Sequence, residues 1–274
     1  MYNYKYKFEL WGKRKLTKIK RIAVYTLCLL LVAGILAGCG KTADSGGKKK
    51  WVVGTSPDYP PFEFMDDKNE YAGFDMDLIR EVAKRLDVEL ELKSLEFDSL
   101  IASLKAGKID AIISCMSANP ERLLEADFTK PYYVDMQGVV VHPEGKAEVK
   151  TLEDVLKLEF GVQSGSTMAT WAEGKIEEKA VKESQVKQYT DVNAGFLDLK
   201  NQRIEAYVAD LAVARQKAKE LGLEMAVETV LDEEESPGIV LAKGSDEMLE
   251  KLNAILDEME ADGTIKTLED KWLK

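Results

Sequence analysis

The chain has 274 residues, of which 45% are hydrophobic and 32% are charged, a composition typical of a folded protein with a large core. Its formal net charge of −11 argues against binding to the phosphates of nucleic acid. With one histidine in the sequence, His-ligated metal sites and Ser-His-Asp catalysis have almost no basis. We therefore expect no nucleic-acid partner and none of the familiar hydrolase mechanisms. We also expect no metal or other cofactor and no enzymatic activity.

The first 38 residues have the pattern of a secretory signal peptide. They carry a net charge of +7, which leaves −18 for the rest of the chain, and they end in a 15-residue uncharged apolar run at 22–36. Such a run is short for a membrane-spanning helix and typical of a signal-peptide core. The following Leu36-Ala37-Gly38-Cys39 resembles the lipobox of bacterial lipoproteins, in which the cysteine becomes the lipid-modified first residue. We expect a lipid anchor on Cys39 at the extracytoplasmic face of the cell membrane; the alternative is an uncleaved anchor helix.

A flexible tether is expected at 39–50, where Gly, Ser and charged residues predominate. Cys28 lies in the segment to be removed and Cys39 would carry lipid. The mature domain then keeps Cys115 alone, so we expect no intrachain disulfide.

From Trp51 onward, strand and helix patterns alternate. Asp75 can cap a helix whose apolar residues recur at the i, i+3, i+4 spacing of one buried face. A second helix is expected at 100–107, and strands are expected at 51–54, 88–92 and 109–115. This β-α-β-α-β order predicts a mostly parallel sheet flanked by helices.

The same alternation restarts after Tyr132-Tyr133 and predicts a second α/β unit. Strands are expected at 138–142, 160–163, 186–189 and 205–209, and helices near 151–157, from 166, at 193–200 and at 211–221. The turn-rich sequence DEEESPG at 232–238 then marks a boundary. A strand at 239–242, a helix at 245–262 and a last helix reaching Trp272 complete the chain.

Six segments, in this order and spacing, resemble the family 3 extracellular solute-binding proteins, the amino-acid receptors of bacterial ABC importers. They are VGTSPDYPPFEF at 53–64, AGFDMDL at 72–78, IDAIISCMSANPERLLEADFTKPYY at 109–133, GVQSGST at 161–167, IEAYVAD at 204–210 and the terminal EADGTIKTLEDKWL. The resemblance implies a periplasmic-binding-protein type II fold, in which two α/β lobes are joined by two crossing strands. Lobe one would comprise 51–134 and 237–274, and lobe two would comprise 135–236.

The resemblance also implies which residues bind the two charges of a free amino acid. Both charges lose water in a cleft, so each must meet an opposite charge or good hydrogen bonds. Arg122 matches the family's carboxylate-binding arginine, and Asp210 matches its ammonium-binding aspartate. From the residues alone, Arg122 could instead pair on the surface with Glu121 or Glu125. Asp210 could cap the helix at 211–221, and its two oxygens would allow capping and ligand binding together.

Further residues of the cleft follow from the same resemblance. Thr167 begins a helix whose N–H groups favour an anion, so we expect it beside Arg122; helix capping without ligand contact is the alternative. Tyr59 and Phe97 match aromatic residues that sandwich the ligand, and Ser117 matches a hydroxyl group on the carboxylate. Cys115 stands where many members have Gly or Ser and where the backbone carbonyl meets the ammonium; we expect its thiol to be buried and inert.

The ligand's side chain is predicted from two positions. Ser56 occupies a place where receptors for basic amino acids tend to present an aspartate, and Gln163 faces the same region. We therefore expect a neutral polar ligand such as glutamine. A basic amino acid is the alternative, since Asp58 could supply a carboxylate and the acidic domain attracts cations.

The expected mechanism is closure of two lobes over the ligand, followed by recognition of the closed form by an ABC permease. We expect a monomer held at the membrane through its lipid. Two alternatives are a secreted dehydratase-type enzyme on the same scaffold and a sensory lipoprotein that does not take part in transport.

Overall fold

The computed structural model describes residues 48–134, 136–145, 148–229 and 236–274. The predicted signal peptide, Cys39 and most of the predicted tether lie outside the described residues. Residues 48–274 form one unit. Among the described residues, no helix has the length and apolar character needed to span a bilayer.

The first sheet has five strands in the order β5-β1-β6-β13-β7. Its strands are β1 (Lys50–Thr55), β5 (Glu89–Ser94), β6 (Ala111–Ile112), β7 (Ala126–Phe128) and β13 (Val240–Ala242). β1 runs parallel to β5 and β6, whereas β13 is antiparallel to both β6 and β7. Four of the five strands therefore point in one direction, and β13 alone is reversed.

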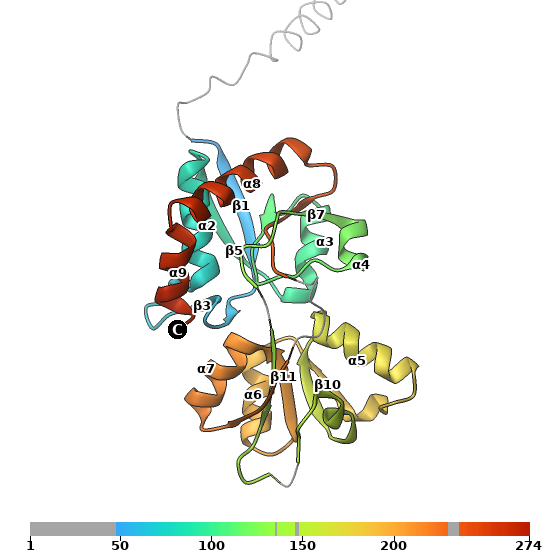
Figure 1. The fold of residues 1–274 in the computed structure, drawn as a ribbon. Helices are drawn as coiled ribbons and strands as arrows, with labels where there is room; N and C mark the ends of the chain where they lie inside the picture. The colour runs from blue at the N-terminus through green and yellow to red at the C-terminus, as the bar shows by residue number, and fades with distance from the viewer. Residues whose placement is uncertain (1–47, 135, 146–147, 230–235) are drawn as a thin grey trace, which may run out of the picture. The chain divides into compact units, whose positions relative to one another are not determined.

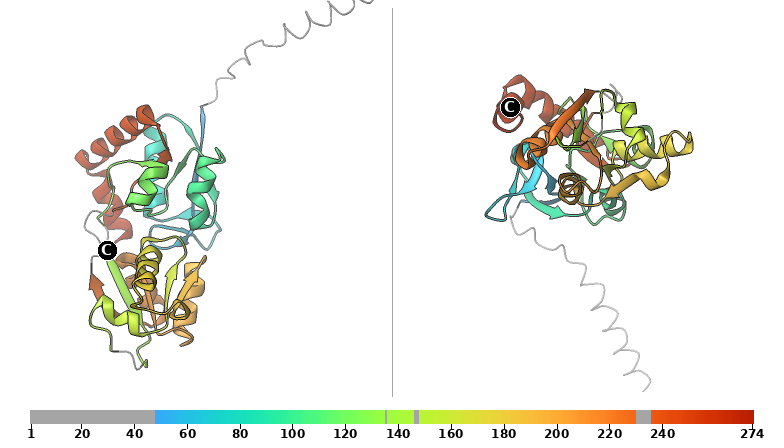
Figure 2. Two further views of the ribbon diagram at one scale, coloured as in Figure 1. Left: turned by 90° about the vertical axis from the view of Figure 1, so that its right-hand side faces the viewer. Right: turned by 90° about the horizontal axis from the view of Figure 1, so that it is seen from below.

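Helices lie against both faces of this sheet (Figures 1 and 2). They are α2 (Phe74–Arg85), the 3-10 turn η1 (Phe97–Ser99), α3 (Leu100–Lys105), α4 (Pro120–Glu125), α8 (Asp246–Ala261) and α9 (Thr264–Trp272). α2, α8 and α9 pack against one another, and α3 packs on β1, β6 and β13. The apolar side chains of α2 at the predicted spacing are fully buried, which confirms that helix.

The predicted start of α2 is wrong in one respect. Asp75 does not cap the helix, because the N-cap residue is Gly73, with φ of 123°. A Cβ atom at Gly73 would lie 2.1 Å from the carbonyl oxygen of Phe62, so this position needs glycine. Asp75 lies in the first helical turn and is fully buried.

The second sheet also has five strands, in the order β10-β9-β11-β8-β12. They are β8 (Gln137–Val141), β9 (Phe160–Gln163), β10 (Val186–Tyr189), β11 (Ala206–Asp210) and β12 (Glu224–Thr229). β9 is parallel to β10 and β11, whereas β8 is antiparallel to β11 and β12. Again four strands share one direction and one is reversed. In both sheets the reversed strand is the one that the chain enters after passing from the other sheet.

Helices cover both faces of the second sheet as well. They are η2 (Leu152–Lys157), α5 (Thr167–Glu177), η3 (Glu183–Gln185), α6 (Val192–Lys200) and α7 (Leu211–Leu221). α6 and α7 pack with apolar residues of one face, and α5 packs on the other. The segment predicted as a helix near 151–157 is the 3-10 helix η2.

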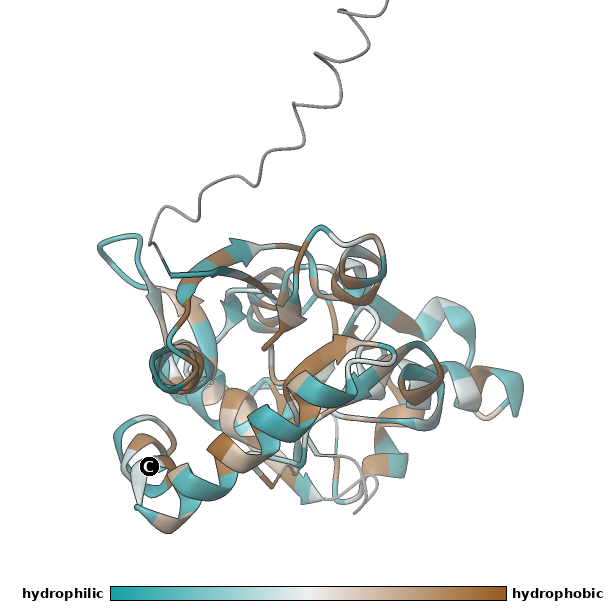
Figure 3. Cartoon of the chain, turned by 90° about the horizontal axis from the view of Figure 1, so that it is seen from above, coloured by the Kyte–Doolittle hydropathy of each residue, from teal (hydrophilic) through white to brown (hydrophobic). Residues whose placement is uncertain are grey.

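Hydrophobic residues are concentrated in the strands and on the inner sides of the helices (Figure 3). Separate clusters of buried side chains lie under α3 and under α5, and a larger cluster includes residues of both sheets. These two sheets with helices on both faces confirm the predicted α/β class.

Several elements differ from the prediction. The sequence analysis missed β12, as well as a small sheet of β2 (Asp58–Tyr59), β3 (Glu63–Met65) and β4 (Tyr71–Ala72). The strand predicted at 109–115 is regular only in β6, and it cannot include Cys115, whose left-handed φ of 43° an extended strand does not allow.

The two crossings of the chain between the sheets lie side by side. The amide of Tyr132 donates to the carbonyl of Pro237 at 3.1 Å, and the amide of Gly238 donates to the carbonyl of Met116 at 3.2 Å. Ser117 and Pro237 also form an isolated bridge. The segment that follows β6 is thus held against the second crossing, which in turn contacts the first. The division into lobes at 134 and 237 stays a prediction.

Candidate functional site

Eight of the nine residues predicted to contact a ligand line one small cavity. They are Tyr59, Phe97, Cys115, Ser117, Arg122, Gln163, Thr167 and Asp210, and the sequence analysis missed a further lining residue, Met168. The ninth predicted residue, Ser56, is buried but is outside this lining. The cavity has a volume of about 10 Å³, which is room for about one water molecule. An amino acid therefore enters only if the two sides of the cavity move apart.

Arg122 is placed by the short helix α4. Asn119 caps this helix, since its Oδ1 accepts the amide of Arg122 at 2.8 Å, and Pro120 occupies the first helical position. Arg122 is 8% exposed, and its guanidinium donates to the carbonyl of Ser117 at 2.6 Å and to that of Gly165 at 2.8 Å. Gly165 belongs to the second α/β unit, so Arg122 joins the two units. The alternative of a surface arginine paired with Glu121 or Glu125 is wrong, because its guanidinium is buried in the cavity.

Asp210 is the last residue of β11 and is 5% exposed. It occupies the N-cap position of α7, yet its side chain makes no capping hydrogen bond. The carboxylate is directed to the first unit instead, where Oδ2 accepts the thiol of Cys115 at 3.6 Å. The amide of Asp210 donates to the phenol oxygen of Tyr59 at 3.1 Å. This carboxylate therefore does not cap α7. Its position at the carboxyl end of a strand is where ligands bind in α/β sheets.

Cys115 lies between these charged groups in a strained conformation. Its φ of 43° is uncommon for a residue with a Cβ atom and easily adopted by glycine. In that conformation the backbone amide donates to Asp75 and the thiol donates to Asp210. The thiol is buried as expected, and it lines the site.

The second unit contributes the N-terminal turn of α5 and the end of β9. Ser166 caps α5, because its Oγ accepts the amide of Ala169 at 3.1 Å. Thr167 is the first residue of the helix and lines the cavity, so capping does not use its side chain. The Nε2 atom of Gln163 is buried and has no hydrogen-bond partner among the described residues. The site thus combines a helix N-terminus, which favours anions, with an amide donor.

Aromatic side chains enclose the site from the first unit. Phe97 lies under Arg122, with the guanidinium carbon 5.5 Å from the ring centroid, which is within cation–π range. Tyr59 is 4% exposed and uses its hydroxyl group to hold the backbone of Asp210. Phe97 thus contacts Arg122, Tyr59 contacts Asp210, and both aromatic residues line the cavity.

Asp58, which is held by Ser56, makes another hydrogen bond from the first unit to the second. The Ser56 hydroxyl donates to Asp58 Oδ1 at 3.0 Å, and the amide of Val192 at the start of α6 donates to Asp58 Oδ2 at 2.8 Å. Burial raises the pKa of Asp58, and these two hydrogen bonds oppose that rise. Asp58 is outside the lining of the cavity.

Two buried acids that the sequence analysis overlooked lie behind the cavity. Glu63 and Asp75 are at most 1% exposed. Burial raises the pKa of Asp75 to about 7, and burial together with the charge of Asp75 raises the pKa of Glu63 well above its usual value. Both acids occur within segments quoted for the family resemblance, PPFEF and GFDMDL, and a charged residue inside an apolar run was the signal that could have found them.

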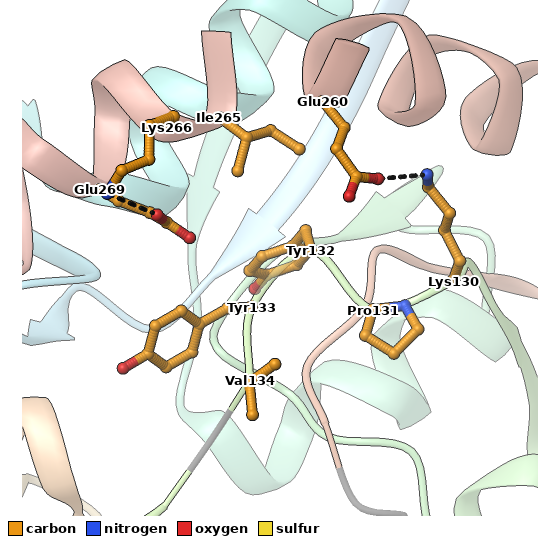
Figure 4. Close-up of a pocket in the computed structure, with 9 residues that line it drawn as sticks. All are labelled: Lys130, Pro131, Tyr132, Tyr133, Val134, Glu260, Ile265, Lys266 and Glu269. Carbon is orange, nitrogen blue, oxygen red and sulfur yellow. Dashed lines mark hydrogen bonds and ion pairs between the residues drawn. The ribbon is translucent and has the colours of Figure 1, made fainter. Parts of the chain in front are cut away.

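Two larger cavities elsewhere contain none of the predicted site residues. One of about 320 Å³ lies between the first crossing and α9, and its charged residues pair with one another (Figure 4). Lys130 contacts Glu260 at 3.3 Å and Lys266 contacts Glu269 at 3.4 Å. A groove of about 490 Å³ runs between α7 and the C-terminal residues. Neither presents an uncompensated buried charge to a ligand.

Two α/β units that present a guanidinium and a carboxylate to one cavity define a two-lobed solute-binding protein. The sequence pattern of the bacterial extracellular solute-binding proteins, family 3, matches residues 51–274. The chain therefore belongs to this family, as its sequence resemblance predicted.

Known proteins similar to this chain agree with that assignment. It is 35% identical over 250 residues to ABC transporter arginine-binding protein 1 of Escherichia coli (strain K12), covering 89% of this chain and 98% of that protein. An ancestral arginine-binding protein bound to arginine matches with a TM-score of 0.77 and 36% identity, covering 83% and 99% of the two chains. A structure described as an ancestral arginine-binding protein bound to glutamine matches with a TM-score of 0.75 and 36% identity, covering 82% and 98% of the two chains.

A further solved structure bears on the enzyme alternative. It is an ancestral amino acid-binding protein described as a precursor of cyclohexadienyl dehydratase, and it matches with a TM-score of 0.73 and 30% identity, covering 82% and 96% of the two chains. These relatives are described as binding proteins, which confirms that the chain is a binding protein rather than an enzyme.

Proposed function

We propose that this protein captures a free amino acid between its two lobes and delivers it to the permease of an ABC importer. The observation that carries the proposal is the placement of Arg122, on α4 of the first α/β unit, and Asp210, on β11 of the second, in the lining of one cavity. These are the cationic and the anionic side chains of that lining, and they match the two charges of a zwitterion. Arg122 would bind the carboxylate with its planar fork, and Asp210 would bind the ammonium.

Closure follows from the hydrogen bonds that already join the lobes. Asp58 accepts from Val192, Tyr59 accepts from Asp210, and Arg122 donates to Gly165. Because the cavity is smaller than an amino acid, these contacts must open before a ligand enters. The ligand carboxylate would then replace the Gly165 carbonyl as a partner of Arg122. A ligand that contacts both lobes stabilises the closed form, since only that form provides both sets of contacts.

A neutral polar side chain such as that of glutamine is our first candidate for the ligand. In the lining, Asp210 is matched to the ammonium, so a cationic side chain would find no second carboxylate there. The unpaired Nε2 donor of Gln163 would be satisfied by the side-chain carbonyl oxygen of glutamine. Arginine is the second candidate, supported by the names of the relatives. The ancestral protein described with each of these two ligands supports both.

Calorimetric titration of the purified protein with glutamine, arginine and the other common amino acids tests the proposal. Micromolar binding corresponds to about −8 kcal/mol. Tighter binding of glutamine than of arginine would support the neutral ligand, and the reverse order would assign the site to arginine. Failure of every amino acid to bind would reject the proposed function.

We also propose that the mature protein is a monomer anchored at the membrane through lipid on Cys39. The support is the lipobox-like sequence directly after an apolar run. A Cys39→Ser variant should appear in the soluble fraction of cells, whereas the wild-type protein should sediment with membranes. If the variant sediments with the membranes, the proposal of a lipid anchor on Cys39 is wrong.

A further inference from the structure

Glu63, on β3, and Asp75, on α2, form a buried pair of carboxyl groups directly behind the cavity. Each uses one oxygen to hold the segment that ends in Cys115. Asp75 Oδ2 accepts the amide of Cys115 at 2.7 Å, and Glu63 Oε1 accepts the hydroxyl of Ser114 at 2.8 Å. The Ser114 oxygen in turn accepts the amide of Ser56 at 3.0 Å. The pair therefore fixes two backbone segments beside the ligand site.

The other oxygen of each carboxyl group indicates a shared proton. Glu63 Oε2 and Asp75 Oδ1 are buried, and neither has a hydrogen-bond partner among the described residues. Two ionised carboxylates would leave both oxygens without a donor and would repel each other. One proton between the two groups would supply the missing hydrogen bond, and such a bond would lower the pKa of Asp75 against the stronger effect of burial.

The groups around the pair are acidic or neutral. Tyr132, from the first crossing, donates its hydroxyl to Asp75 Oδ2 at 2.9 Å, and its ring forms part of the wall of the separate cavity in Figure 4. Asp58 on β2 and Asp210 on β11 face the pair, and their charges raise the pKa of Glu63. Asp210 likewise raises the pKa of Asp75. A change in charge at Asp210 is thus felt by both buried acids.

Cys115 connects the pair to the ammonium site. Its amide donates to Asp75 and its thiol donates to Asp210, so Cys115 links the carboxyl group of Asp75 to that of Asp210. An ammonium ion bound to Asp210 would compensate the negative charge that disfavours ionisation of Asp75. Binding would then favour loss of the proton from the pair, and by linkage the protein would bind its ligand more tightly once that proton is gone.

We propose that Glu63 and Asp75 are positioning residues of the ammonium site, a proton-sharing pair that holds the Ser114–Cys115 backbone and releases a proton to solvent when an amino acid binds Asp210. This inference rests on the proposed function, because it needs an ammonium ion at Asp210. It gives the ligand affinity a pH dependence that neither the zwitterion nor Arg122 has near neutral pH.

The test is the dissociation constant of the tighter ligand of glutamine and arginine, measured by calorimetry from pH 5.5 to pH 8. For the wild-type protein we expect affinity to rise on the order of tenfold across this range, the factor that corresponds to a shift of about one pKa unit. At pH 7, titrations in phosphate and in Tris should differ in heat, because the two buffers take up the released proton with different enthalpies.

Two variants separate positioning from a general structural role. Asp75→Asn imitates the protonated acid and keeps an oxygen for the Cys115 amide, so it should bind about tenfold more weakly than wild type at pH 8, with a flat pH profile and no proton release. Asp77→Asn removes an acid two residues further along α2, whose partners are Arg80, Lys271 and Trp272, and should keep the wild-type profile.

The outcomes distinguish this inference from the function on which it rests. Binding by the wild-type protein with a flat pH profile and no buffer dependence would overturn the proton-sharing pair and leave the proposed function intact. A profile for Asp75→Asn that equals that of wild type would overturn it as well. Failure of the wild-type protein to bind any amino acid at any pH would reject both.

Discussion

Arg122 and Asp210 reach the same cavity by different structural means. In lobe two, Asp210 ends a regular strand whose preceding residues, Tyr207, Val208 and Ala209, are buried apolar core. In lobe one, Arg122 follows an irregular segment whose backbone is held by buried polar groups. Lobe two therefore positions its charge through secondary structure, whereas lobe one uses a network of side chains distant in sequence. We expect lobe one to be more sensitive to single polar substitutions.

The largest effect on binding is expected from Arg122 in lobe one. Arg122→Ala should weaken ligand binding by about 2 to 5 kcal/mol, because the ligand carboxylate would be buried without its partner. Calorimetry measures the change, and Arg80→Ala serves as control since Arg80 is an exposed arginine on α2. Affinity of the Arg122 variant within twofold of wild type would show that lobe one does not bind the carboxylate.

The network of lobe one should also make stability depend on pH. Burial raises the pKa of Asp75 in the folded protein from its ordinary value of 3.8 to about 7. Between these values the folded state holds a proton that the unfolded state has lost, so stability falls as pH rises through this window. Relative to Asp75→Asn, wild type should lose on the order of 1 kcal/mol per pH unit there, as measured by urea unfolding. If the free energy of unfolding of the two proteins changes with pH in parallel, the pKa of Asp75 is not raised in the folded state.

Asp210 tests the contribution of lobe two. Asp210→Asn should weaken binding by about 1.5 to 3 kcal/mol, the range for a hydrogen bond to a charged group, with little change in melting temperature. Glu177→Gln, an exposed acid of α5, is the control for loss of one negative charge from the same lobe. If the two variants bind alike, the ammonium is bound elsewhere.

The smallest effect concerns the strain at Cys115. Cys115→Gly and Cys115→Ala both remove the thiol, but only glycine adopts a φ of 43° without steric cost. The glycine variant should be more stable than the alanine variant by about 1 kcal/mol, as determined from thermal unfolding. An alanine variant of equal or greater stability would show that this segment of lobe one is not strained.

The sequence was most informative where apolar periodicity is regular. Strand β9 and helix α7 have the bounds predicted for them, because a continuous apolar run marks the fully buried strand and a helical apolar pattern marks the buried face of the helix. Short elements of lobe one were not predicted, since β2, β3 and β4 have two or three residues each and no pattern develops over that length.

The candidate site was predictable only in part, for a similar reason. Motif order indicated Arg122, Gln163, Thr167 and Asp210, which lie next to helix starts or strand ends. Ser56 was placed in the lining, but its hydroxyl is turned to Asp58. The rotamer and partner of such a side chain depend on neighbours that the linear sequence does not place.

By itself, the sequence determined the α/β class, the family and the two opposite charges offered to a ligand, because local patterning and motif spacing are properties of neighbouring residues. Only the tertiary structure decided that Glu63 and Asp75 meet behind Cys115 and that Asp210 faces the cavity instead of capping α7. Those outcomes depend on contacts between residues up to 95 positions apart, where burial and the exclusion of water determine which charges interact.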